Sequence, residues 1–342
     1  MTSASVIYLL RTKLKYVLGA ICVSTLLLIS GLSKQFTNTA SRRHLYRSRW
    51  MNVDTGFVPE SQTPLFDVRN ASGAMQGAFR LENLVPVRNE FVYERLNWIT
   101  SSDFFNDLVA RKPDNDDPQV LQLIRRMMDP PSQRMRKHSL PPYETPQSLV
   151  LEEVIDVGRK GFFVECGALD GERSSNTNFL ESKFDWQGLL IEADPSYYTQ
   201  LLGKNRKAWS INACLSPVNR TSFITFGEMR DGRGHVMLSG TEEKFKSESK
   251  YIVPCFTLES MMLALNRTTI GFFSLDVEGA EVEVLKTINF NRLDIKTLTV
   301  EYEHVTGGVE GLKSLLTKRG MRLYKNIDER DIWAKDLFFV KS

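Results

Sequence analysis

Residues 162–171 read FFVECGALDG, and this stretch decides the fold class. An apolar strand carries the acidic residue Glu165 near its end, and Gly167 and Gly171 follow, where the backbone can turn sharply and approach a ligand closely. Doubly wound α/β sheets bind cofactors at such a place, outside the carboxyl ends of parallel strands. The stretch therefore predicts the first strand of a parallel sheet, with a ligand site at its carboxyl end.

Outward from this stretch, apolar strands alternate with helical patterns. The predicted strands are FFVEC (162–166), GLLIE (188–192), AWSINACLS (208–216), GFFSLD (271–276) and TLTVEYE (297–303). The predicted helices cover 149–157, 176–183, 197–202, 258–265, 280–288 and 309–319. A strand pair near 223–226 and 253–257, and a closing pair at 321–325 and 336–342, lack intervening helices. The pattern predicts a doubly wound, mostly parallel Rossmann-like sheet with an antiparallel edge.

Acidic residues recur where the predicted strands end. Glu165 suits a cationic or hydroxyl-rich ligand, whereas a pyrophosphate site needs bare N–H groups, so S-adenosylmethionine fits better than NAD. Glu192 ends the second strand, where a carboxylate can accept hydrogen bonds from both ribose hydroxyls. Asp276 and Glu278 end the fourth strand and could act as a general base toward an acceptor hydroxyl or as ligands of a divalent metal. Helix capping with solvent exposure is the competing interpretation for Glu278.

The strings FVECGALDG, GLLIEADP, INACLS and SLDVEGAEVEVLKTI resemble, in order, the FkbM-type methyltransferase domain, and most closely its invertebrate Star-like branch. The resemblance covers residues 147–342. It implies a class I methyltransferase fold that uses S-adenosylmethionine and no metal. The residues that it places around the cofactor are Glu165, Gly167, Asp170, Gly171 and Glu192, and it places 276–279 on the acceptor side, with Asp276 and Glu278 as candidate catalytic residues.

The Star-like branch has a single membrane span of type II topology and is associated with export of membrane-tethered growth-factor precursors from the endoplasmic reticulum. The resemblance therefore implies a trafficking factor that binds membrane-protein cargo in the endoplasmic reticulum, Golgi or endosomes. An active O-methyltransferase acting on a glycan, lipid or protein is the alternative. Only the second function requires that the cofactor binds.

An uncharged apolar run, residues 16–32, lies between Lys15 and Lys34. Its length is at the short end for a helix that crosses a hydrocarbon core of about 30 Å. We expect a cytosolic tail (1–15), a signal-anchor (16–33) in contact with membrane lipid, a lumenal stem (34–147) and the methyltransferase-like domain (148–342). A cleaved signal peptide is the alternative to the anchor.

Two further patterns bear on the lumenal placement. The sequons at Asn70, Asn219 and Asn266 predict N-glycosylation, although such triplets also arise by chance. Of the four cysteines, Cys22 lies in the apolar run, and Cys214 and Cys255 fall in separate predicted strands. We expect these two to form a disulfide and leave Cys166 free, and three buried thiols are the alternative.

The charge of the chain argues against nucleic acid as a partner. Its 342 residues carry 44 Lys and Arg and 41 Asp and Glu, a net charge of +3. Residues 151–342 alone hold 25 basic and 28 acidic residues, so the part with the motifs is slightly acidic. A nucleic-acid-binding domain would need a concentrated basic surface.

Overall fold

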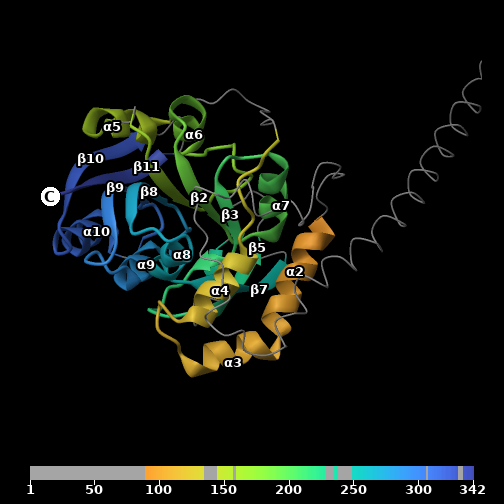
Figure 1. Cartoon of the computed structure of the whole chain (residues 1–342). Coiled ribbons are helices and arrows are strands. Elements are labelled where there is room, and N and C mark those ends of the chain that lie inside the picture. The colour runs from red at the N-terminus through yellow and green to blue at the C-terminus, as the bar shows by residue number, and fades with distance from the viewer. Residues whose placement is uncertain are drawn as a thin grey trace, which may run out of the picture. The chain divides into compact units, whose positions relative to one another are not determined.

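The computed structural model describes residues 89–134, 145–156, 159–228, 235–237, 249–305, 307–329 and 334–342 (Figure 1). The chain divides into a unit from Met1 to Ala78 and a compact unit from Phe79 to Ser342, and every described residue belongs to the second. The predicted tail, the apolar segment 16–33 and Asn70 lie outside the described residues. Within the part that is described, no helix is long and apolar enough to cross a membrane.

A seven-stranded sheet forms the centre of this unit, in the order β10-β11-β9-β8-β1-β2-β3. The strands are β1 (Phe162–Cys166), β2 (Gln187–Glu192), β3 (Trp209–Asn212), β8 (Thr269–Leu275), β9 (Asp294–Glu301), β10 (Met321–Glu329) and β11 (Ala334–Lys341). Only β11 runs antiparallel to its neighbours β9 and β10 among these strands. The predicted fold class, a mostly parallel Rossmann-like sheet with an antiparallel edge, is confirmed.

Helices follow the strands as the sequence pattern predicts. They are α5 (Pro146–Val154), α6 (Asn178–Phe184), α7 (Pro195–Gly203), α8 (Leu258–Ala264), α9 (Glu281–Thr287) and α10 (Gly308–Thr317). Several begin at a side chain that accepts hydrogen bonds from the first free backbone amides. Asp194 caps α7, which continues with Pro195, and Thr257 caps α8. The second strand and the helix after it are therefore separated by a sharp, locally encoded turn.

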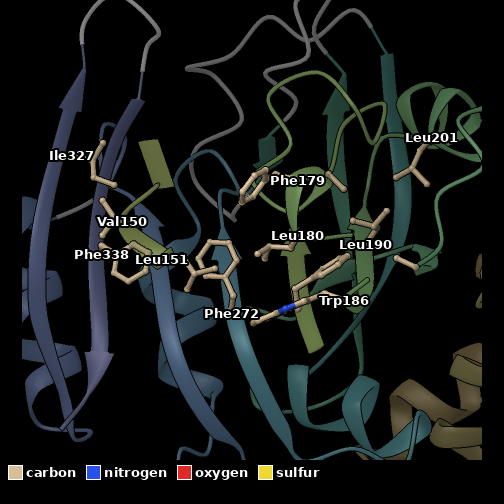
Figure 2. Packing of buried hydrophobic residues seen from close by; sticks show 13 residues of the cluster. Val150, Leu151, Phe179, Leu180, Trp186, Leu190, Leu201, Phe272, Ile327 and Phe338 are labelled. Atoms are coloured by element: carbon tan, nitrogen blue, oxygen red, sulfur yellow. The ribbon is translucent and has the colours of Figure 1, made fainter. Parts of the chain in front are cut away.

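One face of the sheet packs against α5 and α6 through a continuous apolar cluster, shown in Figure 2. Phe163, Phe272 and Phe338 come from three strands, and their side chains are completely buried. Every residue of β1 is buried, as expected for a central parallel strand that is covered on both faces. The carboxyl ends of β1 and β8 are thus fixed by a rigid core beneath them.

A second, four-stranded sheet has the order β4-β7-β5-β6. Its strands are β4 (Cys214–Leu215), β5 (Ser222–Glu228), β6 (His235–Met237) and β7 (Ser249–Phe256). The predicted strand 208–216 is therefore wrong as a single element. Its first part pairs with β2 only as far as Glu192, where β2 ends, and its last part pairs with β7 instead.

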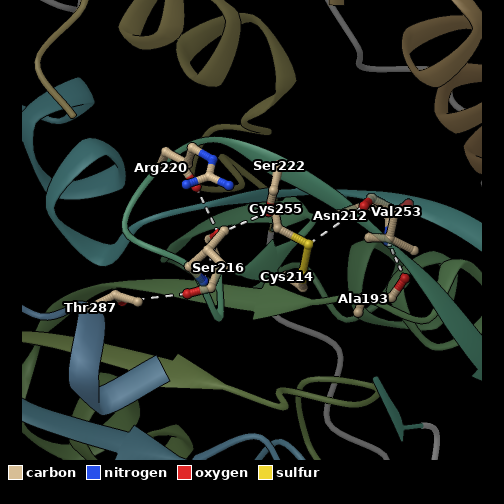
Figure 3. Close-up of a disulfide and its surroundings, with 10 residues drawn as sticks. Ala193, Asn212, Cys214, Ser216, Arg220, Ser222, Val253, Cys255 and Thr287 are labelled. Atoms are coloured by element: carbon tan, nitrogen blue, oxygen red, sulfur yellow. Dashed lines mark hydrogen bonds between the residues drawn. A yellow bond between two sulfur atoms is a disulfide. The ribbon is translucent and has the colours of Figure 1, made fainter. Parts of the chain in front are cut away.

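The structure contains the disulfide between Cys214 and Cys255, which face each other in the parallel pair β4 and β7 (Figure 3). Both cysteines are buried, and they pack with Leu96 and Val253 in a small apolar cluster. Beside this bridge, Ser216 donates to the carbonyl of Arg220 at 2.7 Å. The disulfide thus links two neighbouring strands of the second sheet, at the point where the chain enters this sheet from β3.

Further helices lie before α5 in the described part of the chain: α2 (Asn89–Ser101), α3 (Asp103–Arg111) and α4 (Pro118–Met127). Helix α2 packs against α7 and β7, and α4 packs against α8. After α4, Asp129 forms an antiparallel bridge to Ser210 on the edge strand β3. The compact unit therefore begins well before residue 148, because α2 and α4 pack against elements that follow that residue.

Candidate functional site

Carboxylates gather at one edge of the main sheet, where neighbouring parallel strands end. Glu165 lies at the end of β1, Glu192 at the end of β2, and Asp276 directly after β8. The strand order reverses direction at β1, since β2 lies on one side of it and β8 on the other. Such a switch point is where open α/β sheets bind ligands. The sequence-predicted residues are thus brought to one edge.

Gly167 occupies the junction between β1 and β8. Its backbone has φ +82°, and a Cβ atom at this position would lie 2.0 Å from the backbone oxygen of Asp276. The amide of Asp276 in turn donates to the carbonyl of Cys166 at 3.2 Å. Glycine is therefore required here because the ends of the two strands are in direct contact.

Glu165 faces the loop that follows its own strand. Its carboxylate accepts from the Ser175 hydroxyl at 2.8 Å, the Thr177 hydroxyl at 2.6 Å and the Asn176 amide at 2.6 Å. Burial raises the pKa of Glu165, and the positive charge of Arg206 and these hydrogen bonds oppose the rise. The sequence predicted a cofactor ligand, whereas the structure places Glu165 as an acceptor that organises the loop.

Asp170 and Gly171 lie in the same loop. One Asp170 oxygen accepts from the amides of Glu172 at 2.9 Å and Arg173 at 2.7 Å, and the other lies 3.4 Å from Lys204 Nζ. Gly171 has φ +76°, and a Cβ atom there would lie 2.9 Å from Leu201. Both residues therefore shape the loop beside the end of β1.

Glu192 is 5% exposed and sits between the ends of β2 and β1. Its carboxylate accepts from the amides of Leu169 and Asp194, each at 2.7 Å. Burial, together with the charge of Asp194, raises the pKa of Glu192 to about 8, although hydrogen bonds from the amides of Asp194, Leu169 and Ala193 oppose the rise. These hydrogen bonds leave part of the acceptor capacity of the carboxylate unused, because a carboxylate offers about four lone pairs.

Asn212 ends β3 directly opposite Glu192 in the strand register. Its amide group donates to the carbonyls of Glu192 at 2.8 Å and Ala193 at 3.0 Å. Its oxygen is buried and has no hydrogen-bond partner, a costly arrangement that suits a missing donor. A nucleoside supplies hydroxyl and amine donors, so Glu192 and Asn212 fit the nucleoside part of S-adenosylmethionine.

A second group of acids lies on the other side of the switch point, around the turn after β8 and the end of β9. Oxygen atoms of Asp276, Glu281 and Glu301 lie within 4.8 Å of one another. Glu278 lies 3.2 Å from Nδ1 of His304, which is half exposed. We call Asp276, Glu278, Glu281, Glu301 and His304 the acidic rim. It holds the two predicted catalytic residues side by side with further acids.

The electrostatics of the acidic rim favour protonated carboxyls. Burial, followed by repulsion from Glu281 and Glu278, raises the pKa of Glu301 to about 8. Asp276 is exposed as a residue, but desolvation of its carboxyl and then repulsion from Glu278 and Glu301 raise its pKa well above the usual range. Repulsion from these carboxylates would raise the pKa of Asp276 even without desolvation of its carboxyl. Crowding by these neighbouring acids therefore favours the protonated form of Asp276.

Glu281 begins α9, one residue after the start of the predicted helix 280–288. Its side chain is fully buried and accepts from the amides of Val277 at 2.8 Å and Gly279 at 3.0 Å. Glu278 lies within this turn and has φ +55°, a backbone conformation unusual for a residue with a side chain. The turn is thus held by Glu281, and Glu278 projects from it.

The remaining predicted sites lie apart from this edge. Asn266 is exposed in the segment between α8 and the start of β8, at the opposite end of that strand from Asp276. Asn219 is exposed and accepts from the Asn115 amide group at 3.1 Å. Cys166 is buried, free and inert, because burial raises its pKa.

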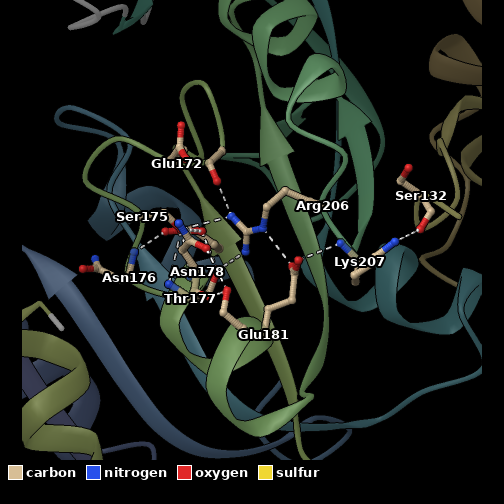
Figure 4. A network of polar contacts seen from close by, with 12 residues as sticks. Ser132, Glu172, Ser175, Asn176, Thr177, Asn178, Glu181, Arg206 and Lys207 are labelled. Carbon is tan, nitrogen blue, oxygen red and sulfur yellow. Dashed lines mark hydrogen bonds and ion pairs between the residues drawn. The ribbon is translucent and has the colours of Figure 1, made fainter. Parts of the chain in front are cut away.

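Sequence reasoning missed Arg206, which joins the loop after β1 to the rest of the domain (Figure 4). The residue stands in the string KNRK (204–207), between a predicted helix and a predicted strand. Nothing in that string distinguishes a buried arginine from a solvated one. Its role follows only from the tertiary structure, which brings it beside Ser175 and Thr177.

Comparison with known proteins agrees with the geometry at the level of the domain. Residues 165–323 match the methyltransferase FkbM domain. This region runs from the last residues of β1 into β10 and contains both groups of carboxylates. No curated protein matches the sequence.

Several solved structures are similar to the chain. Methyltransferase FkbM from Methylobacillus flagellatus has 13% identity and a TM-score of 0.35, with 74% of this chain and 59% of that chain covered. A human methyltransferase 10 domain containing protein has 10% identity and a TM-score of 0.35, covering 67% and 98%. The N-terminal domain of human METTL16 in complex with SAH has 12% identity and a TM-score of 0.31, covering 72% and 97%.

Proposed function

We propose that the domain binds S-adenosylmethionine and transfers its methyl group to a hydroxyl acceptor on a glycan, lipid or protein. The observation that carries the proposal is the pair Glu192 and Asn212 at the ends of β2 and β3. Glu192 offers a buried carboxyl group with remaining acceptor capacity, and Asn212 offers a buried oxygen without a partner. The match of residues 165–323 to the FkbM domain supports the same cofactor.

The cofactor would supply an electrophilic methyl group, and the chain's own residues would do the remaining work. Glu192 and Asn212 would hold the nucleoside part. Methyl transfer depends mainly on how the acceptor is placed, so few side chains are obligatory. Asp276 is the candidate base that would take the acceptor's proton, since desolvation and repulsion from the neighbouring acids raise its pKa, which makes its carboxylate a stronger base. Glu278 and His304 would neighbour the acceptor.

We further propose that the chain is a type II single-pass protein of the endoplasmic reticulum, Golgi or endosomal membrane, anchored in lipid by residues 16–33. The disulfide between Cys214 and Cys255 supports a lumenal domain, because such bonds persist in oxidising compartments. Asn219 and Asn266, both exposed, support it as well, since a glycan at either could extend into solvent.

A Star-like role in the transport of membrane-tethered cargo, such as growth-factor precursors, is the second candidate. One observation favours it. The carboxylates of Glu165 and Asp170 are satisfied by the chain itself, so this part of the edge is complete without a cofactor. A domain of this kind could serve as a binding module that has kept the methyltransferase fold.

Calorimetric titration of the full chain in mild detergent with S-adenosylmethionine distinguishes the two candidates. Binding that disappears in Glu192→Ala but persists in Glu310→Ala, a change at an exposed residue of α10, supports methyl transfer. No binding at millimolar cofactor by a folded chain refutes it. In that case, slower export of a membrane-tethered precursor in cells that lack the protein would support the trafficking role.

A further inference from the structure

The loop between β1 and α6 is held by an arginine that is distant in sequence. Arg206 lies between α7 and β3 and is 3% exposed. Its guanidinium group also packs over the ring of Phe163, 5.9 Å from the centroid. A buried arginine needs partners for several N–H groups, so its surroundings reveal what it organises.

The guanidinium group donates in several directions at once (Figure 4). Nε donates to Glu181 on α6 at 2.8 Å, and the side chains of this pair are 2% and 1% exposed. Nη2 donates to the Thr177 hydroxyl at 3.1 Å, and Nη1 to the Ser175 hydroxyl at 3.2 Å and to the Gly171 carbonyl. A single planar group thus contacts the loop from Gly171 to Thr177 and the helix that follows.

The two hydroxyl groups connect Arg206 to Glu165. Ser175 and Thr177 each accept from Arg206 and donate to the Glu165 carboxylate. A hydroxyl has one hydrogen to donate, so the cation on one side and the anion on the other fix its direction. The loop is therefore bound between two buried charges that lie on different elements.

The charges explain why this arrangement is sensitive to the arginine. Arg206 is the cation shared by Glu165 and Glu181, both buried. Burial raises the pKa of Glu165, and Arg206 is the largest influence that opposes the rise. A buried ion pair contributes little net stability compared with apolar packing, but removing one partner is strongly destabilising. The buried charges of Arg206 and its partners therefore serve to hold the loop from Gly171 to Thr177 in a single conformation.

The loop also touches the acceptor side of the edge. The Asn176 amide group donates to the Ser274 hydroxyl on β8 at 3.0 Å, two residues before Asp276. We propose that Arg206 is a positioning residue, which fixes the loop 170–178 so that cofactor and acceptor meet at the end of β1. This inference rests on the proposed methyl transfer, and it assigns a role to a residue that contacts neither reactant.

The test combines amide exchange with ligand affinity in the full chain in mild detergent. Arg206→Lys keeps the charge but loses the planar fork, and Thr177→Val removes one hydroxyl with little change in shape. In both variants the amides of Asn176 and Asn178, which donate to Glu165 and Ser175, should exchange at least about tenfold faster. S-adenosylhomocysteine should bind at least about tenfold more weakly to Arg206→Lys, corresponding to about 1.4 kcal/mol.

Leu316→Ala serves as the control for lost stability, because Leu316 is fully buried in α10 and has no contact with this network. It should lower the melting temperature and leave affinity and exchange at residues 176–178 unchanged. Faster exchange in Arg206→Lys with unchanged affinity would overturn the positioning role, as would unchanged exchange. If the wild-type chain does not bind S-adenosylhomocysteine, methyl transfer itself is refuted, and exchange alone still decides whether Arg206 holds the loop.

Discussion

Removing the disulfide between Cys214 and Cys255 should destabilise the domain by about 4 kcal/mol. The bond joins directly opposed residues of β4 and β7, so it closes the chain segment that contains β5 and β6. Both cysteines are buried in an apolar cluster with Leu96 and Val253. Serine in their place would bury two hydroxyls, so the double variant Cys214→Ala, Cys255→Ala is the cleaner change.

The magnitude follows from the length of the closed segment. The two cysteines are 41 residues apart in sequence. A cross-link over that distance lowers the chain entropy of the unfolded state by an amount worth about 4 kcal/mol at 25 °C. For a domain of this size, each 1 kcal/mol corresponds to roughly 2–4 °C in melting temperature. The expected decrease is therefore about 8–16 °C.

Thermal unfolding of the wild-type chain, the double variant and the wild-type chain with reductant measures the effect. Cys166→Ala is the matched control, because Cys166 is buried at the end of β1 but unpaired. Reductant should lower the melting temperature of the wild-type chain and of Cys166→Ala, and leave the double variant unchanged. A decrease below about 3 °C in the double variant would refute the reasoning from segment closure.

Three further predictions follow from the carboxyl edge and its surroundings. Gly167→Ala should lower stability by at least about 3 kcal/mol, measured by urea unfolding, because its new Cβ would collide with the Asp276 backbone oxygen. Glu301→Gln should leave the melting temperature unchanged at pH 4.5 and raise it by about 2–4 °C at pH 8.5. The pKa of Glu301 is raised to about 8, so its ionisation destabilises the native state as pH rises from about 4.5 through 8. In secretory cells, Asn266→Gln and Thr268→Ala should each remove the same glycosidase-sensitive increase in apparent mass, since Asn266 is exposed.

The main strands could be predicted from sequence because each is an apolar run that the core buries completely. Predicted FFVEC coincides with β1, and GLLIE differs from β2 by one residue. The gathering of Glu165, Glu192 and Asp276 at one edge also followed, since the carboxyl ends of parallel strands meet there. Both features follow from the pattern of apolar residues along each strand and from the parallel direction of neighbouring strands.

The features that sequence reasoning missed depend on tertiary partners. The run 208–216 divides into β3 and β4 because β2 ends at Glu192 and gives the later residues no neighbour. Helix α4 lies within the predicted stem, and the partner of its buried apolar face, α8, follows only from the tertiary structure. A motif also does not reveal which way a side chain faces. Glu165 lies in the predicted position, but its carboxylate is occupied by Ser175, Thr177 and the Asn176 amide.

Glu165 and Glu192 look equivalent in sequence, but their surroundings give them different capacities. Glu165 accepts three hydrogen bonds from its own loop and shares the charge of Arg206, so it has little left to offer a ligand. Glu192 accepts only from backbone amides, and no cation is among the influences on its pKa. Its partner in the strand register, Asn212, has a buried oxygen without a hydrogen-bond partner. A ligand donor would therefore be more valuable at the end of β2 than at the end of β1. For this reason Glu192→Ala tests cofactor binding directly, whereas a change at Glu165 would chiefly report the shape of the loop.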